Sequence, residues 1–234
     1  MKKSIRTFVN RRIDRLTKAS IEKKSHLIFE NLTNSTFLDK GEFIGVYCAK
    51  DNEVQTSNLI QCLLQSGKRV FAPRVAGNSL NFHEIYSIQE LSPGFCGIYE
   101  PNADLPINND LEIIIMPCVG VDSAGNRLGK GLAFYDNFLQ SNPPLYKICL
   151  AFETQVVSKI QPEAHDVPVD VIVTESRVIL ASKSKISKLI DGVSFANFQL
   201  DQARYLIKKN NLQLCLGVVI IGEDKASQLY VKKK

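Results

Sequence analysis

The residues best suited to chemistry lie in one short segment, residues 116–139, where basic residues alternate with glycines. Arg127 and Lys130 flank Gly129, and Gly131 follows directly. Glycines leave the backbone free to approach a ligand, so exposed N–H groups and two positive charges can meet one anion. A helix is expected just after this segment, and helix N-termini favour phosphate. Because the spacing fits neither a Walker loop nor a dinucleotide fingerprint, an ordinary glycine turn stays the alternative to a phosphate-binding loop.

The elements that must position this segment follow from hydrophobic periodicity. Three- and four-residue spacing predicts helices near the start of the chain and at about 20–32, 53–64 and 133–140. Short apolar runs predict strands at 43–48, 69–72, 112–116, 147–152, 169–173 and 177–180. Strands and helices in alternation predict an α/β fold, with a mostly parallel sheet and helices on both faces in a Rossmann-like, three-layer arrangement. We expect the substrate site at the carboxyl ends of the strands.

Composition excludes several classes of protein. The net charge of +5 comes largely from basic residues near the two ends of the 234-residue chain. These lack interleaved aromatics and a nucleic-acid-binding fingerprint, so no nucleic acid is expected as a partner. No apolar run approaches the roughly 20 residues that span a bilayer, and no signal peptide is evident, so we expect a cytoplasmic protein without a membrane partner. The six cysteines have no zinc-site spacing and are expected to be buried free thiols.

Over about residues 2 to 180 the chain resembles the 5-formyltetrahydrofolate cyclo-ligase family. The glycine-containing segment is similar to the family signature R-L-G-x-G-x-G-[FY]-Y-D, which corresponds here to Arg127 to Asp136. Further matches occur in the family's order: Lys2-x-x-Ile5-Arg6, Asn52-Glu53-Val54-x-Thr56, Pro73-Arg74, Gly97-Ile98-Tyr99-Glu100-Pro101, and His165 to Asp170 ahead of Val173-Thr174-Glu175. Each match is weak alone, and the ordered set is specific.

The resemblance implies an enzyme that uses ATP as co-substrate and Mg²⁺ to convert 5-formyltetrahydrofolate to 5,10-methenyltetrahydrofolate. ATP phosphorylates the formyl oxygen, N10 attacks the formyl carbon, and phosphate leaves, so the products include ADP and phosphate. Such chemistry needs charge neutralisation around a transferring phosphoryl group more than it needs a protein nucleophile.

The resemblance also implies the roles of individual residues. ATP would be bound by Lys2 and Arg6 and by the continuous segment Arg127, Leu128, Gly129, Lys130, Gly131, Leu132, Ala133, Phe134 and Tyr135. Within that segment Arg127, Lys130 and Tyr135 would be catalytic. Glu53 and Tyr135 would bind the folate. Asp136 and Asp166 would hold Mg²⁺, which prefers oxygen ligands.

Several of these residues have simpler explanations. Lys2 and Arg6 stand four residues apart on one helix face, where like charges repel slightly, but a solvated face would tolerate them. Glu53 can be a helix N-terminal residue favoured by the macrodipole, and Asp136 a helix-start residue. Asp166 can be a turn residue ahead of a proline.

The segment departs from the family signature at two positions inside it. Ala133 replaces the third glycine, and a left-handed conformation there would cost about 1 kcal/mol. Leu132 stands where many members have Gly or Lys, and Asn137, just beyond, where Arg is common. The alternative function is therefore a non-catalytic folate- or nucleotide-binding remnant with a decayed phosphate loop.

The chain changes character near residue 182. We expect a cyclo-ligase domain over 1–182, a polar linker over 183–187, and a short, incomplete α/β segment over 188–234. That segment resembles the N-terminus of methylenetetrahydrofolate dehydrogenase/cyclohydrolase, and Tyr230 and Lys234 match its Tyr-x-x-x-Lys pair. One helix and one strand cannot enclose a core, so we expect no dehydrogenase activity. The expected partners are thus 5-formyltetrahydrofolate and ATP, bound by a monomer.

Overall fold

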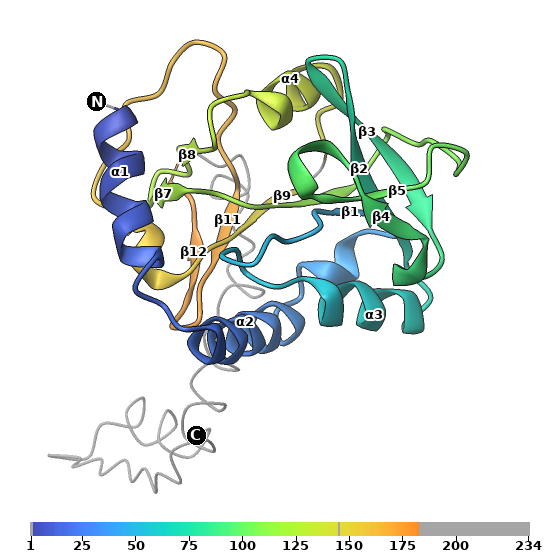
Figure 1. Ribbon diagram of the computed structural model, residues 1–234, viewed down its shortest axis with the longest axis horizontal. Helices are drawn as coiled ribbons and strands as arrows, with labels where there is room; N and C mark the ends of the chain where they lie inside the picture. Colours follow the sequence, from blue (N-terminus) through green and yellow to red (C-terminus); the bar gives the residue numbers. More distant parts are fainter. Residues whose placement is uncertain (1, 145, 183–234) are drawn as a thin grey trace, which may run out of the picture. The chain divides into compact units, whose positions relative to one another are not determined.

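A seven-stranded sheet is the centre of the computed structural model, which describes residues 2–144 and 146–182 (Figure 1). The strand order is β12-β11-β9-β6-β1-β2-β3. The five inner strands run parallel, and an antiparallel strand closes each edge. Their bounds are β1 (Phe43–Val46), β2 (Arg69–Ala76), β3 (Ser79–Ile85), β6 (Ile113–Met116), β9 (Tyr146–Leu150), β11 (Val171–Val173) and β12 (Val178–Leu180).

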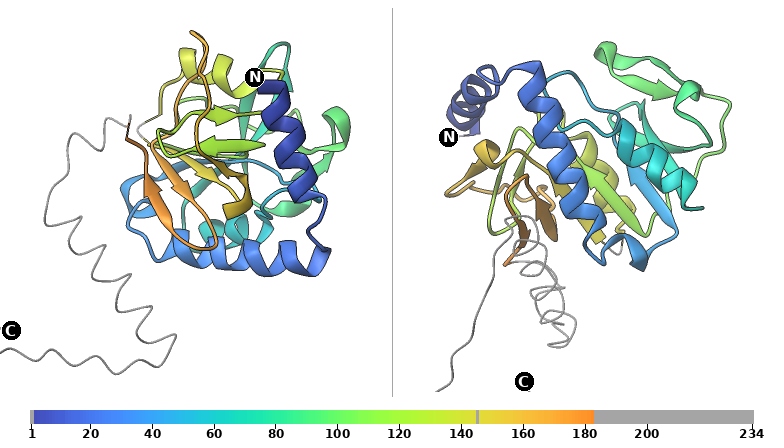
Figure 2. Two further views of the ribbon diagram at one scale, coloured as in Figure 1. Left: turned by 90° about the vertical axis from the view of Figure 1, so that its left-hand side faces the viewer. Right: turned by 90° about the horizontal axis from the view of Figure 1, so that it is seen from below.

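Helices cover both faces of this sheet, as Figures 1 and 2 show. The helices α2 (Lys18–Thr33) and α3 (Ser57–Gln65) lie on one face, and α4 (Phe134–Ser141) lies on the other. The helix α1 (Lys2–Ile13) packs beside a small second sheet, described below. The predicted α/β fold, with a mostly parallel sheet between two helical layers, is confirmed.

The strand β6 explains why both faces need a cover. All four of its residues are fully buried. Ile113 and Ile115 belong to the core under α2 and α3, whereas Ile114 and Met116 belong to the core under α4. Side chains alternate across a strand, so a continuous apolar run requires apolar partners on both sides.

Two smaller sheets and several short 3₁₀ turns accompany the central sheet. A three-stranded sheet joins β10, β7 and β8 in that order, and β4 pairs with β5 in a hairpin. Their bounds are β4 (Leu91–Pro93), β5 (Tyr99–Pro101), β7 (Gly120–Asp122), β8 (Arg127–Leu128) and β10 (Val156–Val157). Short 3₁₀ turns are η1 (Leu38–Lys40), η2 (Ile88–Glu90), η3 (Phe95–Gly97) and η4 (Glu153–Gln155).

The prediction that a strand ends before Pro73 was wrong. The strand β2 continues through Pro73 to Ala76 and pairs with β3 along its length. Its pairing with β1 reaches only Phe71, so one edge of β2 is free beyond that point and tolerates a proline. The hairpin partner β3 was missed, although the intervening Gly77-Asn78 pair is typical of a two-residue hairpin turn.

Helix boundaries also moved. The predicted helix from Glu53 begins only at Ser57, because Thr56 precedes it and donates its hydroxyl to the Tyr47 carbonyl at 2.7 Å. Glu53 therefore lies in a loop and is not a helix-start residue. The helix α2 begins two residues before the predicted Ser20, since the Thr17 hydroxyl accepts a hydrogen bond from the Ser20 N–H.

Three further expectations meet different outcomes. Those for residues 183–187 and 188–234, including Tyr230 and Lys234, lie outside the described residues. Of the five cysteines that the structure describes, Cys48, Cys118 and Cys149 are buried free thiols, but Cys62 is half-buried and Cys96 is exposed. Within 2–144 and 146–182, none of the helices has the length and apolar character needed to cross a membrane.

Candidate active site

A cavity of about 210 Å³ opens at the carboxyl ends of β1, β2 and β6. The strand β2 lies on one side of β1 and β6 on the other, so the loops that follow β1 and β6 diverge and leave a space between them. Three segments form most of the wall: the loop after β1, the turn around η3, and the segment between β8 and α4. The cavity lies where the sequence predicted the substrate site.

The segment between β8 and α4 takes a conformation that only its small residues allow. Gly131 has φ of +110°, and Ala133, at the start of α4, has φ of +53°. A side-chain carbon on Gly129 would lie 3.1 Å from Arg127 Nη1, tighter than most real contacts. The left-handed residue anticipated at position 133 is therefore present, and alanine adopts it at a cost in strain.

Arg127 and Asp136 form a buried ion pair beside this segment. Arg127 Nη2 donates to Asp136 Oδ2 at 2.9 Å, and Asp136 Oδ1 accepts from the Val167 N–H at 3.2 Å. The guanidinium also lies over the Tyr135 ring, 5.4 Å from its centroid. Arg127 Nε has no hydrogen-bond partner, alone among the buried side-chain nitrogens and oxygens of the described residues. Such a donor is costly to leave unmet and favours an acceptor in the cavity.

Lys130 and Glu53 bridge two walls of the cavity. Lys130 Nζ lies 2.6 Å from Glu53 Oε1, and the other oxygen of Glu53 accepts from the Lys50 N–H at 2.9 Å. The lysine side chain is 51% exposed, whereas that of Glu53 is 11% exposed. The pair therefore joins the glycine-containing segment to the loop after β1 at the mouth of the cavity.

The helix α1 is attached to the far side of the same segment. Arg6 Nε donates to the Gly129 carbonyl at 2.9 Å. Lys2 Nζ lies 2.6 Å from Asp166 Oδ2 and 3.2 Å from Glu163 Oε1. Burial opposes ionisation of Asp166, but hydrogen bonds from the Glu163 N–H and from Lys2 outweigh it, so the pKa of the Asp166 carboxyl is lowered.

The structure thus brings together most of the predicted site residues. Those that line the cavity are Glu53, Arg127, Gly129, Lys130, Leu132, Ala133, Phe134, Tyr135 and Asp136. Those outside its lining are Lys2, Arg6, Leu128, Gly131 and Asp166. Leu128 is buried in β8, and Gly131 belongs to the segment itself, next to Arg6. Lys2 and Arg6 on α1 and Asp166 in the 163–167 loop lie beside the segment.

Sequence reasoning missed several residues of the wall. Lys50 lines the cavity three residues before Glu53, and Phe95 and Cys96 line it from the turn at η3. Phe95 packs edge-on against Phe134, with ring centroids 5.7 Å apart. A charged residue just past a predicted strand was the available signal for Lys50, but the turn reaches the cavity only through tertiary packing.

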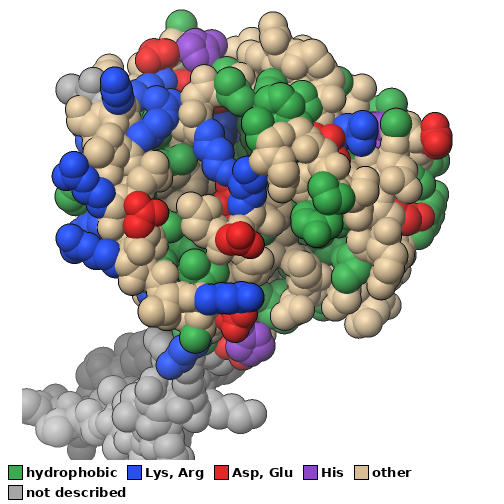
Figure 3. Space-filling view, in the orientation of Figure 1, with side chains coloured by type: hydrophobic (Ala, Val, Ile, Leu, Met, Phe, Trp, Pro, Cys, Tyr) green, Lys and Arg blue, Asp and Glu red, His purple; other side chains and the backbone are tan. Residues whose placement is uncertain are grey.

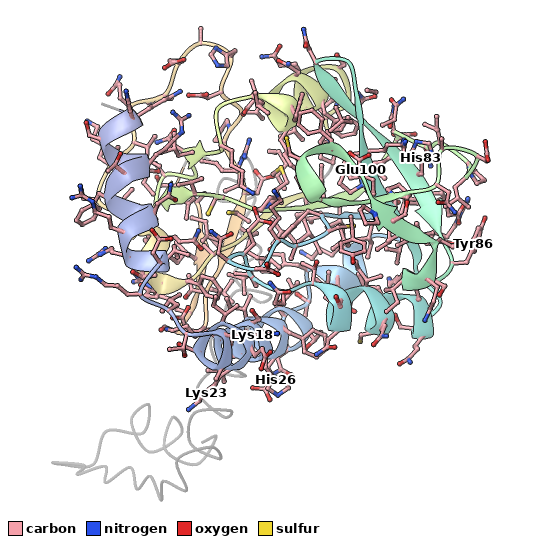
Figure 4. The ribbon with its side chains drawn as sticks, in the orientation of Figure 1. Lys18, Lys23, His26, His83, Tyr86 and Glu100 are labelled. Atoms are coloured by element: carbon pink, nitrogen blue, oxygen red, sulfur yellow. The ribbon has the colours of Figure 1, made fainter. Side chains whose placement is uncertain are left out.

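Glu100 is a second carboxylate in the cavity wall. It is buried, accepts a hydrogen bond from the Val75 N–H at 3.2 Å, and lies 3.6 Å from Arg74 Nη1. Figure 4 shows it beside the β2–β3 hairpin, whereas Tyr86 lies at the outer edge of the sheet. The sequence marked Glu100 only as part of a turn motif.

Burial keeps three side chains of the wall, Tyr47, Cys48 and Tyr135, neutral. It raises the pKa of the Cys48 thiol to about 12 and raises that of Tyr47 well above its ordinary value. Burial likewise raises the pKa of Tyr135, although the nearby Arg127 opposes the shift. These side chains can pack or donate hydrogen bonds, but they do not act as anions near neutral pH.

Positive charge lies mainly on the side of the cavity where α1 stands, as Figure 3 shows. The basic residues of that helix are Lys2, Lys3, Arg6, Arg11 and Arg12. In contrast, Lys18, Lys23 and His26 lie on α2, on the opposite side of the sheet from α4 (Figure 4). Cationic groups thus approach the glycine-containing segment from α1, which suits an anionic ligand there.

A three-layer α/β domain with a charged cavity at the carboxyl ends of its parallel strands is the arrangement in which enzymes of the α/β class bind their substrates. Residues 1–175 match the 5-formyltetrahydrofolate cyclo-ligase family, and the chain belongs to it.

Named relatives agree with this assignment. The chain is 37% identical over 146 residues to 5-formyltetrahydrofolate cyclo-ligase of Escherichia coli strain K12, covering 58% of this chain and 79% of that protein. It is 30% identical over 182 residues to the enzyme of the same name from Haemophilus influenzae, covering 74% and 97%. The solved structure of Aquifex aeolicus 5,10-methenyltetrahydrofolate synthetase is similar, with a TM-score of 0.70, 28% identity, and coverage of 79% of this chain and 94% of that one.

Proposed function

We propose that this protein catalyses the ATP- and Mg²⁺-dependent cyclisation of 5-formyltetrahydrofolate to 5,10-methenyltetrahydrofolate, with release of ADP and phosphate. Family membership supports the reaction. The observation that carries the proposal is the Lys130–Glu53 contact, because it joins a cationic glycine-containing segment to a carboxylate-bearing loop across one cavity. The cavity could then hold two substrates side by side: a polyphosphate, which needs cationic donors, and a heterocycle rich in N–H groups, which needs acceptors.

In this proposal the segment between β8 and α4 binds the triphosphate. Lys130 and the backbone N–H groups around Gly129 and Gly131 neutralise the phosphoryl group as it transfers to the formyl oxygen. Arg127 contributes its unpartnered Nε, while its pairing with Asp136 fixes the guanidinium plane. From outside the cavity, Lys2 and Arg6 add positive charge next to the segment.

The folate would occupy the rest of the cavity. Glu53 accepts hydrogen bonds from the pterin ring, and Tyr135 and the half-exposed Leu132 pack on its flat surface. Once the formyl oxygen carries the phosphoryl group, N10 attacks the formyl carbon, loses its proton, and phosphate departs as the new ring closes. The enzyme's contribution is orientation and charge neutralisation rather than a covalent bond to the substrate.

Asp136 and Asp166 are the magnesium ligands of the proposal. The hydrogen bond from the Val167 N–H brings Asp136 close to the peptide that follows Asp166. Mg²⁺ takes one or two protein carboxylates and fills its other positions with water and substrate phosphates, so this donor set fits. The described residues hold no cluster of three or more ligating side chains, in keeping with such a sparse site. The ion would supply further charge neutralisation for phosphoryl transfer.

The test is formation of methenyltetrahydrofolate from 5-formyltetrahydrofolate, followed by its absorbance, on the whole chain. We expect turnover that requires both ATP and Mg²⁺. Lys130→Met should lower kcat by at least about tenfold, because a charge that stabilises the transition state is removed. Lys159→Met, at an exposed lysine outside the cavity, is the matched control and should keep full activity. A folded protein that binds ATP without any turnover would refute the proposal and favour the non-catalytic remnant.

We further propose that the enzyme works as a monomer in the cytoplasm, without a nucleic-acid or membrane partner. The basic residues near the two ends of the chain lack a nucleic-acid-binding fingerprint, which supports the absence of a nucleic-acid partner. A single monomer mass in sedimentation, unchanged by added RNA, is the expected result. A dimer mass would overturn the first part of the statement.

A further inference from the structure

One cation of the cavity wall has no role in the function proposed above. Three lysine and arginine side chains line the cavity: Lys50, Arg127 and Lys130. Arg127 is paired with Asp136 and Lys130 with Glu53, whereas Lys50 has no carboxylate within 4.0 Å among the described residues. Its ammonium instead donates to the Cys96 carbonyl at 2.5 Å. An ammonium has three donors, so this single bond leaves hydrogen-bonding capacity for a ligand.

Lys50 is held in a fixed relation to Glu53 by the backbone of one turn. The Lys50 N–H donates to Glu53 Oε2, and the Glu53 N–H donates to the Lys50 carbonyl, both at 2.9 Å. The same carbonyl accepts from Gln55 Nε2 at 2.8 Å. The side chains of Glu53, a carboxylate acceptor, and Lys50, an ammonium donor, thus arise from one hydrogen-bonded turn at the wall of one cavity.

The rest of that wall selects the kind of group the two charges would bind. Much of it is apolar, including Pro73, Val75 and Leu80. A flat ring fits such a space, and its polar edge must carry N–H donors next to a carbonyl acceptor. The pterin of a reduced folate has this edge, with an exocyclic amine, a ring N–H and a 4-oxo group in sequence.

We propose that Lys50 is a specificity-determining residue that donates to the 4-oxo group of the pterin while Glu53 accepts from the adjacent N–H groups. The inference rests on the proposed function, since it takes the folate to occupy this cavity. Together the two side chains recognise an amino-oxo ring edge and disfavour a 4-amino ring, which offers a donor where Lys50 also donates. The Cys96 carbonyl orients the ammonium before substrate binds.

The experiment compares the dissociation constants of 5-formyltetrahydrofolate and of its 4-amino counterpart, measured by calorimetry without ATP. Wild-type protein should prefer the 4-oxo compound. Lys50→Met should reduce that preference by about tenfold, because a charge-assisted hydrogen bond to one ligand alone is lost. Lys50→Gln, which keeps a neutral donor, should retain part of the preference.

Lys68→Met is the matched control, since Lys68 also donates to a backbone carbonyl, that of Gly41 at 2.8 Å, but lies outside the cavity. It should leave the preference unchanged. If Lys50→Met and Lys50→Gln weaken both ligands equally, Lys50 only supports the turn at η3 and the inference is overturned. If wild-type protein binds neither compound, the proposed function itself fails; binding of both without preference sinks only the role of Lys50.

Discussion

Substituting Glu53 with glutamine should tighten the binding of ATP while it weakens the binding of folate. In the structure Lys130 Nζ pairs with Glu53 Oε1 at 2.6 Å, so a triphosphate that binds Lys130 must first break this pair. Glu53→Gln keeps the shape of the side chain and releases Lys130 in advance. Loss of a proposed substrate-binding carboxylate would then improve the affinity for the other substrate.

The exposures of the two side chains set the expected size of the effect. Fully exposed ion pairs contribute about 0.2–1 kcal/mol. Glu53 is only 11% exposed although Lys130 is half-exposed, which places this pair near the upper end of that range. About 1 kcal/mol corresponds to about a fivefold decrease in the dissociation constant of Mg-ATP. Titration calorimetry of Mg-ATP without folate measures this change.

Loss of negative charge from the cavity could tighten ATP by itself, and Glu100→Gln controls for this. Glu100 lines the same cavity but bonds to the Val75 N–H and faces Arg74 instead of Lys130. Equal tightening by both substitutions, or no tightening by Glu53→Gln, would refute the reasoning. In the wild-type protein, folate that binds Glu53 should also release Lys130, so each substrate should strengthen the binding of the other. Glu53→Gln should abolish this coupling.

Three further predictions follow from the conformations and environments of single residues. Ala133→Gly should raise the Tm by about 1–2 °C, because relief of roughly 1 kcal/mol of left-handed strain exceeds the destabilising effect of the unfolded-state entropy that glycine adds. Gly131→Ala, at φ of +110°, should lower the Tm in the same thermal melt. A lower Tm for Ala133→Gly would contradict the strain at position 133. Iodoacetamide at pH 8 should label the exposed Cys96 well before Cys48, whose pKa is raised to about 12 by burial, as peptide mass spectrometry can show; equal labelling would count against the buried thiol. Glu84→Gln should lower the Tm at pH 7, since hydrogen bonds from Arg69 lower the pKa of Glu84 below its ordinary value. That stabilisation is present above about pH 4.3 and is lost as the pH falls through the lower folded-state pKa. The Tm values of variant and wild type should therefore converge at low pH.

The sequence was informative wherever local patterns decide structure. The apolar run around β6 predicted a strand, and Gly129 and Gly131 marked the segment that forms one wall of the cavity. The family signature has a glycine at position 133, and the structure gives Ala133 there the left-handed conformation that a glycine adopts easily. Each of these features depends on residues close together in the chain.

What the sequence missed depends on contacts between distant segments. Pro73 continues a strand only because β1 stops short of it, a fact about the register of a neighbour. Cys96 lines the cavity through contacts between distant segments, among them the hydrogen bond from Lys50, 46 positions earlier, to its carbonyl. No spacing within either segment carries that information. Nor does it show that Lys50, unlike Arg127 and Lys130, has no carboxylate partner among the described residues.

The attachment of α1 to the 129–166 region has a consequence for how this domain matures. Lys2 bonds to Asp166, 164 positions later, and Arg6 bonds to Gly129, 123 positions later. During synthesis α1 leaves the ribosome long before residues 129–166 are made. Its native contacts therefore form only when nearly the whole domain has emerged. Assembly of the side of the cavity formed by the glycine-containing segment is thus a late event, and a peptide fused ahead of Lys2 should slow it more than one placed in an exposed loop of the sheet.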